Sequence, residues 1–272
     1  FGESFNPSND MSAGKISLIK NIKTGSNIFI SIAKGYKQGG FNLGLGLGGD
    51  VTNKDLTYNP EFLTNYEIGI NSRILDSRLN IESVLFYSDR EDQQVLISTQ
   101  IDPKDPNTFS FLTQNAAEGV NYGLEINLDM EVMTDINIFA NVGILKTEIK
   151  NWQSRPDLEG RAQAHAPEKS FAFGINWSLT SKTYLSADVT GKSEFYYSDS
   201  HNNKSKSYNL MNINYGYKNK DWSYTLWVRN VFDTYYSVRG FYFGNEAPNF
   251  EDTLYERHGD PRHAGVSVRY DF

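Results

Sequence analysis

Apolar and polar residues alternate along most of this chain, and the alternation is clearest between residues 119 and 130. Successive side chains of a β-strand point to opposite faces of a sheet, so this period of two predicts a strand with one apolar and one polar face. The apolar face carries Val120, Tyr122, Leu124, Ile126, Leu128 and Met130, and the polar face carries Gly119, Asn121, Gly123, Glu125, Asn127 and Asp129.

The same alternation recurs at 28–32, 66–70, 79–87, 136–144, 171–178, 185–190, 211–217 and 266–272. From these segments we expect about eleven strands. Short polar turns are predicted at 20–26, 75–78, 133–135, 180–182 and 218–221, and long loops at 39–60, 99–109, 151–168, 199–206 and 234–262. Because the two kinds of connection alternate, short turns gather at one rim and long loops at the other, as in an all-β, antiparallel transmembrane β-barrel.

A soluble β-sandwich also has alternating strands, so it is the competing architecture. Sandwich strands are short, about five or six residues, whereas a tilted membrane strand needs about nine to eleven. The segment 119–130 is long enough for the membrane strand. Aromatic pairs near strand ends, such as Tyr215 with Tyr217 and Trp222 with Tyr224, are typical of an interfacial girdle. The membrane barrel is therefore favoured.

Composition narrows the function classes. The chain has 272 residues, a formal net charge of -7 and no cysteine. The acidic balance argues against a nucleic-acid partner that is bound through many phosphates, and the lack of cysteine excludes disulfides and thiolate sites. Every apolar run is far shorter than the roughly 20 residues of a membrane helix. No signal peptide is recognised at the start.

Candidate catalytic and metal-binding patterns are weak. The histidines, His165, His201, His258 and His263, all fall in predicted outer loops, and only the last two approach the spacing of metal ligands. Solvated loop histidines are the better interpretation, so no metal is expected. No nucleophile elbow or Ser/His/Asp spacing is present, and an enzyme is not expected.

Two loop segments have simple explanations. Gly44 to Gly49 lacks the lysine and the βαβ context of a phosphate-binding loop, so flexible-loop glycine is favoured. Asp102, Asp105 and Asn107 do not have the spacing of a calcium loop, and turn chemistry around the neighbouring prolines accounts for them. No cofactor is expected.

The C-terminal region carries a recognisable order of motifs. The run LWVRNVFDTYY at 226–236 precedes a long loop, a Gly-Asp-Pro-Arg element at 259–262 and a last strand that ends in Phe272. This order resembles the end of TonB-dependent outer-membrane receptors, in which N-L-F-D-x-x-Y and G-x-P-R precede a terminal strand with an aromatic last residue. The matching residues are Asn230, Phe232, Asp233, Tyr236, Gly259, Pro261 and Arg262, while Val231 replaces the usual leucine. Segments 28–42, 60–69, 85–95 and 115–125 are similar to the same family in the same order.

The resemblance implies an outer-membrane receptor of a Gram-negative bacterium for energy-coupled uptake of a scarce nutrient, above all a ferric siderophore or similar iron chelate. Family members carry an N-terminal plug, a short box that contacts the energy-coupling TonB complex, and a barrel of about 22 strands. We therefore expect residues 1–272 to be the C-terminal part of such a barrel, without the plug and the first half. A half-barrel would leave two unpaired edges in lipid, which is costly.

Two alternative functions stay open, a passive porin or channel and a soluble carbohydrate-binding β-domain. The partners that the resemblance implies are outer-membrane lipid, the TonB complex through the plug, the barrel assembly machinery and a small nutrient. Tyr270 and Phe272 are the candidate assembly signal, because a free edge strand can be extended by a partner's backbone. Simple anchoring at the membrane interface is the alternative role.

Aromatic and cationic residues in the long loops are the candidate ligand contacts. Aromatic faces and guanidinium groups suit large, partly aromatic, anionic chelates, although aromatic residues at the upper rim also anchor any barrel. The candidates are Phe195, Tyr196, Tyr197, His201, Arg239, Phe241, Tyr242, Phe243 and Arg257. The polar residues Glu125, Asn127, Asp129, Asn176, Asp188 and Arg269 are expected to face the lumen, where they would bond a plug or line water.

Overall fold

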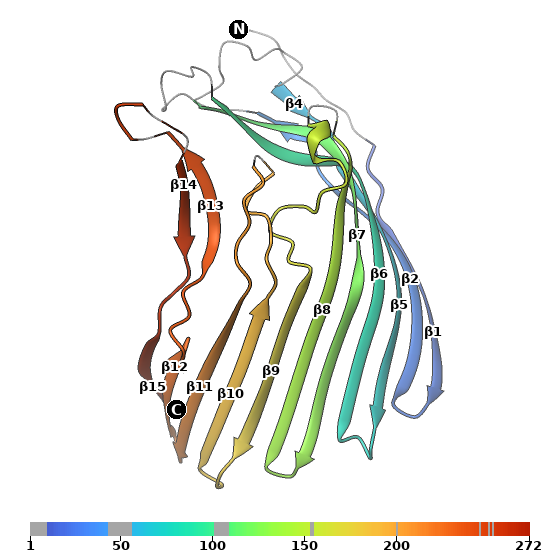
Figure 1. The fold of residues 1–272 in the computed structure, drawn as a ribbon. Coiled ribbons are helices and arrows are strands. Elements are labelled where there is room, and N and C mark those ends of the chain that lie inside the picture. The colour runs from blue at the N-terminus through green and yellow to red at the C-terminus, as the bar shows by residue number, and fades with distance from the viewer. Residues whose placement is uncertain are drawn as a thin grey trace.

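A curved antiparallel sheet of eleven strands forms the body of the protein, in the order β1-β2-β5-β6-β7-β8-β9-β10-β11-β12-β15 (Figure 1). The computed structural model describes residues 10–42, 56–100, 109–152, 155–199, 201–244, 246–249, 251 and 253–272. Neighbouring strands are neighbours in the sequence, apart from two small hairpins inserted in the long loops. The predicted all-β fold, strand number and antiparallel order are confirmed.

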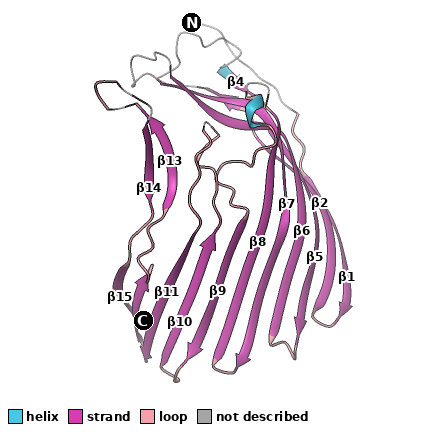
Figure 2. Ribbon diagram, in the orientation of Figure 1, coloured by secondary structure: helices cyan, strands magenta, loops and turns pink. Residues whose placement is uncertain are grey.

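The strands of the sheet, called the wall below, are β1 (Gly14–Lys23), β2 (Ser26–Lys37), β5 (Glu61–Ile74), β6 (Leu79–Gln100), β7 (Phe109–Met133), β8 (Ile136–Asn151), β9 (Lys169–Ser178), β10 (Thr183–Lys192), β11 (Tyr208–Asn219), β12 (Trp222–Arg229) and β15 (His263–Tyr270). Figure 2 shows how strands dominate the architecture. A short 3-10 helix lies at Pro156–Leu158. Within the described ranges, no helix is long and apolar enough to span a membrane.

Two hairpins lie inside segments that the sequence predicts as long loops. One pairs β3 (Gly40–Phe41) with β4 (Thr57–Tyr58), and the other pairs β13 (Ser237–Phe243) with β14 (Thr253–His258). In Figure 1 the β13–β14 hairpin rises above β12 and β15. Neither hairpin shows a clean apolar-polar alternation. The strands of the first are only two residues long, and aromatic and charged residues share a face of the second, so the sequence pattern did not predict them.

The wall is a single layer without a hydrophobic core of its own. Leu85 is 55% exposed, Ile68 48% and Ile30 50%, although all three lie mid-strand on the apolar face. Among the described residues, the buried hydrophobic side chains are Val120, Ile149, Trp152, Leu158, Phe195 and Tyr197, all toward the long-loop end. An apolar face of this extent requires an apolar surrounding such as lipid.

On the polar face, aromatic rings cover glycines across strand pairs. The pairs, called the aromatic–glycine contacts below, are Phe29–Gly69, Phe86–Gly123, Phe139–Gly174, Tyr184–Gly216 and Trp227–Gly265. A Cβ atom on Gly174 would lie 2.3 Å from Cε1 of Phe139, so a larger residue would displace the ring. Each contact joins two strands that a long loop connects, and a further pair, Phe171–Gly191, lies on the apolar face.

Candidate functional site

Three segments at the long-loop end of the wall contain or contact the predicted ligand residues. These are residues 155–168 between β8 and β9, residues 193–207 between β10 and β11, and the β13–β14 hairpin. We call them together the outer loop cluster. The 193–207 segment contacts both of the others, through hydrogen bonds to Arg161 and to the hairpin residues Glu256 and Tyr242.

Arg161 fixes the 193–207 segment to the segment after β8. Its Nη1 donates to the carbonyl of His201 at 3.0 Å and to Oδ1 of Asn202 at 2.8 Å. Its Nη2 donates to the carbonyl of Ser198 at 3.0 Å and to Oδ1 of Asp199 at 2.9 Å. The Arg161 side chain is only 9% exposed. Charge-assisted hydrogen bonds at a buried site are strong, so Arg161 gives this segment one defined conformation.

Tyr196 is held by two cations. Cζ of Arg161 lies 4.4 Å from the centroid of the Tyr196 ring, and Nζ of Lys204 lies 4.6 Å from it. Lys204 also pairs with Glu194 at 2.8 Å. The half-buried ring of Tyr196 is therefore positioned by cation–π attraction rather than by core packing.

Phe195 and Tyr197 are structural members of the cluster. Phe195 is 8% exposed and Tyr197 2%, and their rings meet edge to face at 6.1 Å. The Tyr197 hydroxyl donates to Glu256, and its ring covers Gly240 of β13. Burial, together with the Glu256 contact, raises the pKa of Tyr197 to about 12. The two rings join the 193–207 segment to the hairpin and leave little aromatic surface for a ligand.

His201 and Tyr242 form the second contact between the same segments. Their ring centroids are 4.9 Å apart in an edge arrangement. Nδ1 of His201 accepts from the backbone N–H of Asn203 at 3.3 Å, and the Tyr242 hydroxyl donates to Oδ1 of the same asparagine at 3.0 Å. Burial, and to a smaller extent the charge of Arg161, lowers the pKa of His201. Both rings are half-buried.

Arg239, Phe241 and Arg257 lie apart from these contacts. Gly240 and Glu256 of the hairpin face the 193–207 segment, and Arg239 and Arg257 occupy the opposite face of the same strands. The Phe243 side chain falls outside the described structure. The geometry thus brings Tyr196, Tyr197, His201 and Tyr242 into one cluster. Arg239 and Arg257 make none of these contacts, although the charge of Arg239, after burial, helps to lower the pKa of His165.

Sequence reasoning missed the polar residues that organise the cluster. Arg161, Asn203 and Glu256 make its central hydrogen bonds, yet each comes from a loop or hairpin without periodic pattern. Their partners are 37 to 59 residues away in the sequence. Only a knowledge of which loops are neighbours would have identified them.

The family motif at the end of β12 forms a corner. Asn230 is 4% exposed and has a φ of 49°, a left-handed conformation that asparagine tolerates well. Its Nδ2 donates to the carbonyls of Thr234 at 2.9 Å and Asp260 at 3.1 Å, and its Oδ1 accepts from the Thr234 N–H at 2.8 Å. One side chain therefore ties the exit of β12 to the segment that enters β15.

The other motif residues complete this corner. Oδ1 of Asp233 accepts from the Arg262 N–H at 2.7 Å. The Tyr236 ring occupies the space above Gly259, where any Cβ atom would overlap it, and its centroid lies 4.5 Å from that of the Tyr208 ring in a tilted arrangement. Pro261 lies in the same turn, whereas Phe232 is 71% exposed. The contacts of the motif are structural, and they stabilise the connection between β12 and β15.

The terminal aromatic residues lie at the short-turn end of the wall. The Tyr270 ring is 4.8 Å from Trp222 of β12 and 5.0 Å from Phe272. Phe272 is exposed, and β15 is paired on one side only, with β12. An assembly role for these two residues stays a prediction.

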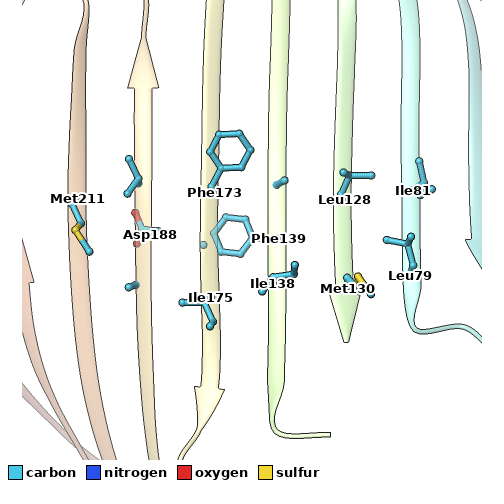
Figure 3. Close-up of a pocket in the computed structure, with 14 residues that line it drawn as sticks. Leu79, Ile81, Leu128, Met130, Ile138, Phe139, Phe173, Ile175, Asp188 and Met211 are labelled. Atoms are coloured by element: carbon cyan, nitrogen blue, oxygen red, sulfur yellow. The ribbon is translucent and has the colours of Figure 1, made fainter. Parts of the chain in front are cut away.

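The other candidate sites offer little support for binding of a polar ligand or a metal ion. A hollow of about 630 Å³ is lined mostly by apolar-face side chains of β6 to β11, among them Ile81, Leu128, Ile138 and Phe173 (Figure 3). It suits acyl chains better than a polar chelate. Across the described residues, no group of three His, Asp or Glu side chains could hold a metal ion. The glycines of 44–49 and Asp102, Asp105 and Asn107 lie outside the described residues.

Comparisons with known proteins agree with the architecture. The chain is similar to the ferric-pyoverdine 358 receptor of Pseudomonas putida, at 27% identity over 233 residues, which are 82% of this chain and 25% of the relative. It thus spans about a quarter of that receptor.

Two solved structures have the same fold. The ferric yersiniabactin uptake receptor FyuA of Yersinia pestis superposes with a TM-score of 0.77 at 17% identity, covering 96% of this chain and 37% of FyuA. The siderophore receptor PiuA of Acinetobacter baumannii gives a TM-score of 0.72 at 18% identity, covering 95% and 35%. The family model described as TonB dependent receptor-like, beta-barrel matches residues 4–231, and the chain therefore belongs to the TonB-dependent receptor β-barrel family.

Proposed function

We propose that this chain is part of an outer-membrane receptor that imports a ferric siderophore or a similar iron chelate with energy from the TonB complex. The observation that carries the proposal is the combination of a lipid-facing, single-layer wall with a rigid cluster of polar and aromatic loops at one rim. Two of the proteins named above are receptors for a ferric siderophore and the third is a siderophore receptor, which supports the class of ligand. Transport would involve no chemical step in these residues.

We further propose that the eleven strands are the C-terminal half of a barrel of about 22 strands. In the sheet, β1 and β15 are each paired on one side only. Unsatisfied backbone groups at such edges are costly in lipid, so further strands must complete the wall. The plug that contacts TonB, and the recognition of Tyr270 and Phe272 by the assembly machinery, belong to the same proposal.

Tyr196, His201 and Tyr242 are the proposed ligand contacts within the outer loop cluster. All three are half-buried, fixed in orientation and carried by adjacent segments. Arg161 and Lys204 hold the Tyr196 ring by cation–π attraction, while their charges are paired with Asp199 and Glu194. Phe195 and Tyr197 are proposed to support these residues rather than to touch the ligand.

The test is uptake of radioactive iron by a Gram-negative host that lacks its own siderophore receptors and carries the full-length gene. We expect uptake of at least one ferric siderophore, and we expect it to disappear when TonB is deleted. Tyr196→Ala should weaken ligand binding to the purified receptor, whereas Tyr217→Ala, at the opposite end of the wall, should not. Uptake that persists without TonB, or bulk conductance in planar bilayers, would instead identify a passive channel. A protein that stays in solution without detergent would favour the carbohydrate-binding domain.

A further inference from the structure

The β13–β14 hairpin places two arginines directly opposite each other. Arg239 of β13 pairs in register with Arg257 of β14. Directly opposed residues of an antiparallel pair have Cβ atoms about 5 Å apart and side chains on the same face, so like charges there repel each other.

These two arginines also differ from the other arginines of the chain in their contacts. All ten lie in the described residues, and the others each make a hydrogen bond or ion pair to an oxygen. Those eight are Arg73, Arg78, Arg90, Arg155, Arg161, Arg229, Arg262 and Arg269. Within the described part of the chain, Arg239 and Arg257 make no such contact, and both are exposed.

The nearest acid on the hairpin does not neutralise the pair. Glu256 precedes Arg257, so its side chain points to the opposite face, where it accepts the hydrogen bond of Tyr197. On the face of the two arginines, the next register pair is Phe241 with Tyr255. The Tyr255 hydroxyl donates to Oε1 of Glu246 at 2.9 Å, so the carboxylate of Glu246 is held at the tip of the Tyr255 side chain. Two guanidinium groups therefore lie beside two aromatic side chains on one surface, in a chain whose net charge is -7.

We propose that Arg239 and Arg257 form an oxyanion-binding site for a phosphate or carboxylate group that carries more than one negative charge. Each planar guanidinium can donate two parallel hydrogen bonds to such a group. A bridging anion turns the repulsion between the two cations into attraction for both. The aromatic pair would lie against the rest of a ligand with a flat or apolar part.

The shared chemistry has two possible sources, an anionic group of the imported chelate and the phosphate of an outer-leaflet lipid headgroup. The assignment to the chelate rests on the proposed uptake function. Binding of a phosphate or carboxylate group by the two arginines does not depend on that function. A direct binding measurement therefore separates failure of this site from failure of the uptake proposal.

The experiment titrates inorganic pyrophosphate into the purified full-length receptor in detergent by calorimetry. R239Q and R257Q should each weaken binding about tenfold or more, and the double variant should remove it. The matched control is R155Q, which removes an arginine that pairs with Asp157 in a neighbouring outer loop and should leave the affinity unchanged. Heat-modifiable gel mobility reports folding. If a glutamine variant does not fold, R239K and R257K replace it and should also weaken binding, because lysine keeps the charge but loses the fork.

Absence of pyrophosphate binding by the unmodified receptor would overturn the site, and so would an equal loss in R155Q, since that would indicate general electrostatics. The same arginine variants then show whether the bound anion belongs to the chelate or to a lipid headgroup. Weaker retention on phosphatidylethanolamine vesicles that contain lipid A identifies the lipid headgroup. A raised half-saturation concentration for iron uptake identifies the chelate.

Discussion

Buried polar side chains hold the long-loop end of this wall together. Arg161 and Asn230 each make several hydrogen bonds to segments far away in the sequence, and both are almost inaccessible to solvent. An unsatisfied buried donor costs about 1–3 kcal/mol, so each side chain specifies one arrangement of its segments. The sequence indicated Asn230 through its motif. Arg161 carried no such signal, because its partners become neighbours only after folding.

Acid should loosen the outer loop cluster through His201. Burial lowers its pKa in the folded protein, so the unfolded segment binds a proton first as the pH falls. The stabilising effect is complete above the ordinary histidine pKa of about 6.5 and is lost as the pH falls from there toward the folded pKa. The protection factors of residues 193–207, which correct hydrogen exchange for its slower intrinsic rate at low pH, should therefore be smaller at about pH 5.5 than at about pH 7.5.

His201→Gln is the control for this effect, since glutamine stays neutral. It should show a smaller acid response, and the remainder is assigned to His165, whose pKa burial also lowers. An unchanged acid response in His201→Gln would contradict the assignment.

Among the strands, those with one apolar and one polar surrounding could be predicted from the sequence, and the others could not. Wall strands show alternation because one face meets an apolar surrounding and the other a polar one. The long, regular pattern at 119–130 therefore located β7 without difficulty. The β13 strand has no such two-sided environment, since Gly240 packs under Tyr197 while Arg239 is exposed. The hairpin was accordingly predicted as part of a loop.

The aromatic–glycine contacts should be sensitive to a single methyl group. Gly174→Ala would bring a Cβ atom against the Phe139 ring and should lower the free energy of unfolding by about 1–3 kcal/mol. Gly35→Ala in β2 is the matched control, because no heavy atom lies within 4 Å of its added Cβ. It should be neutral or slightly stabilising.

The measurement is urea unfolding of the full-length receptor in lipid vesicles. Phe139→Ala combined with Gly174→Ala should recover part of the loss, since the clash is then absent. Equal effects of Gly174→Ala and Gly35→Ala would show that the ring contact is unimportant.

For the whole molecule, the decisive property is the contrast between its two faces. Leu124→Arg, at mid-strand on the apolar face of β7, should destabilise the receptor in a bilayer by about 2–4 kcal/mol. Asn127→Arg, on the polar face of the same strand, should cost much less. Unfolding in vesicles compares the two, and similar losses at both positions would be incompatible with a lipid-facing apolar surface.

The aromatic–glycine contacts also bear on how such a receptor can diversify. A tight turn fixes the register of the strands that it joins, but a long loop cannot. In this wall each pair of strands joined by a long loop has its own ring-over-glycine contact instead. Lengthening a loop adds little closure entropy. The outer loops can therefore gain or lose residues over evolutionary time while every strand keeps its alignment, so that a changed loop needs no new barrel.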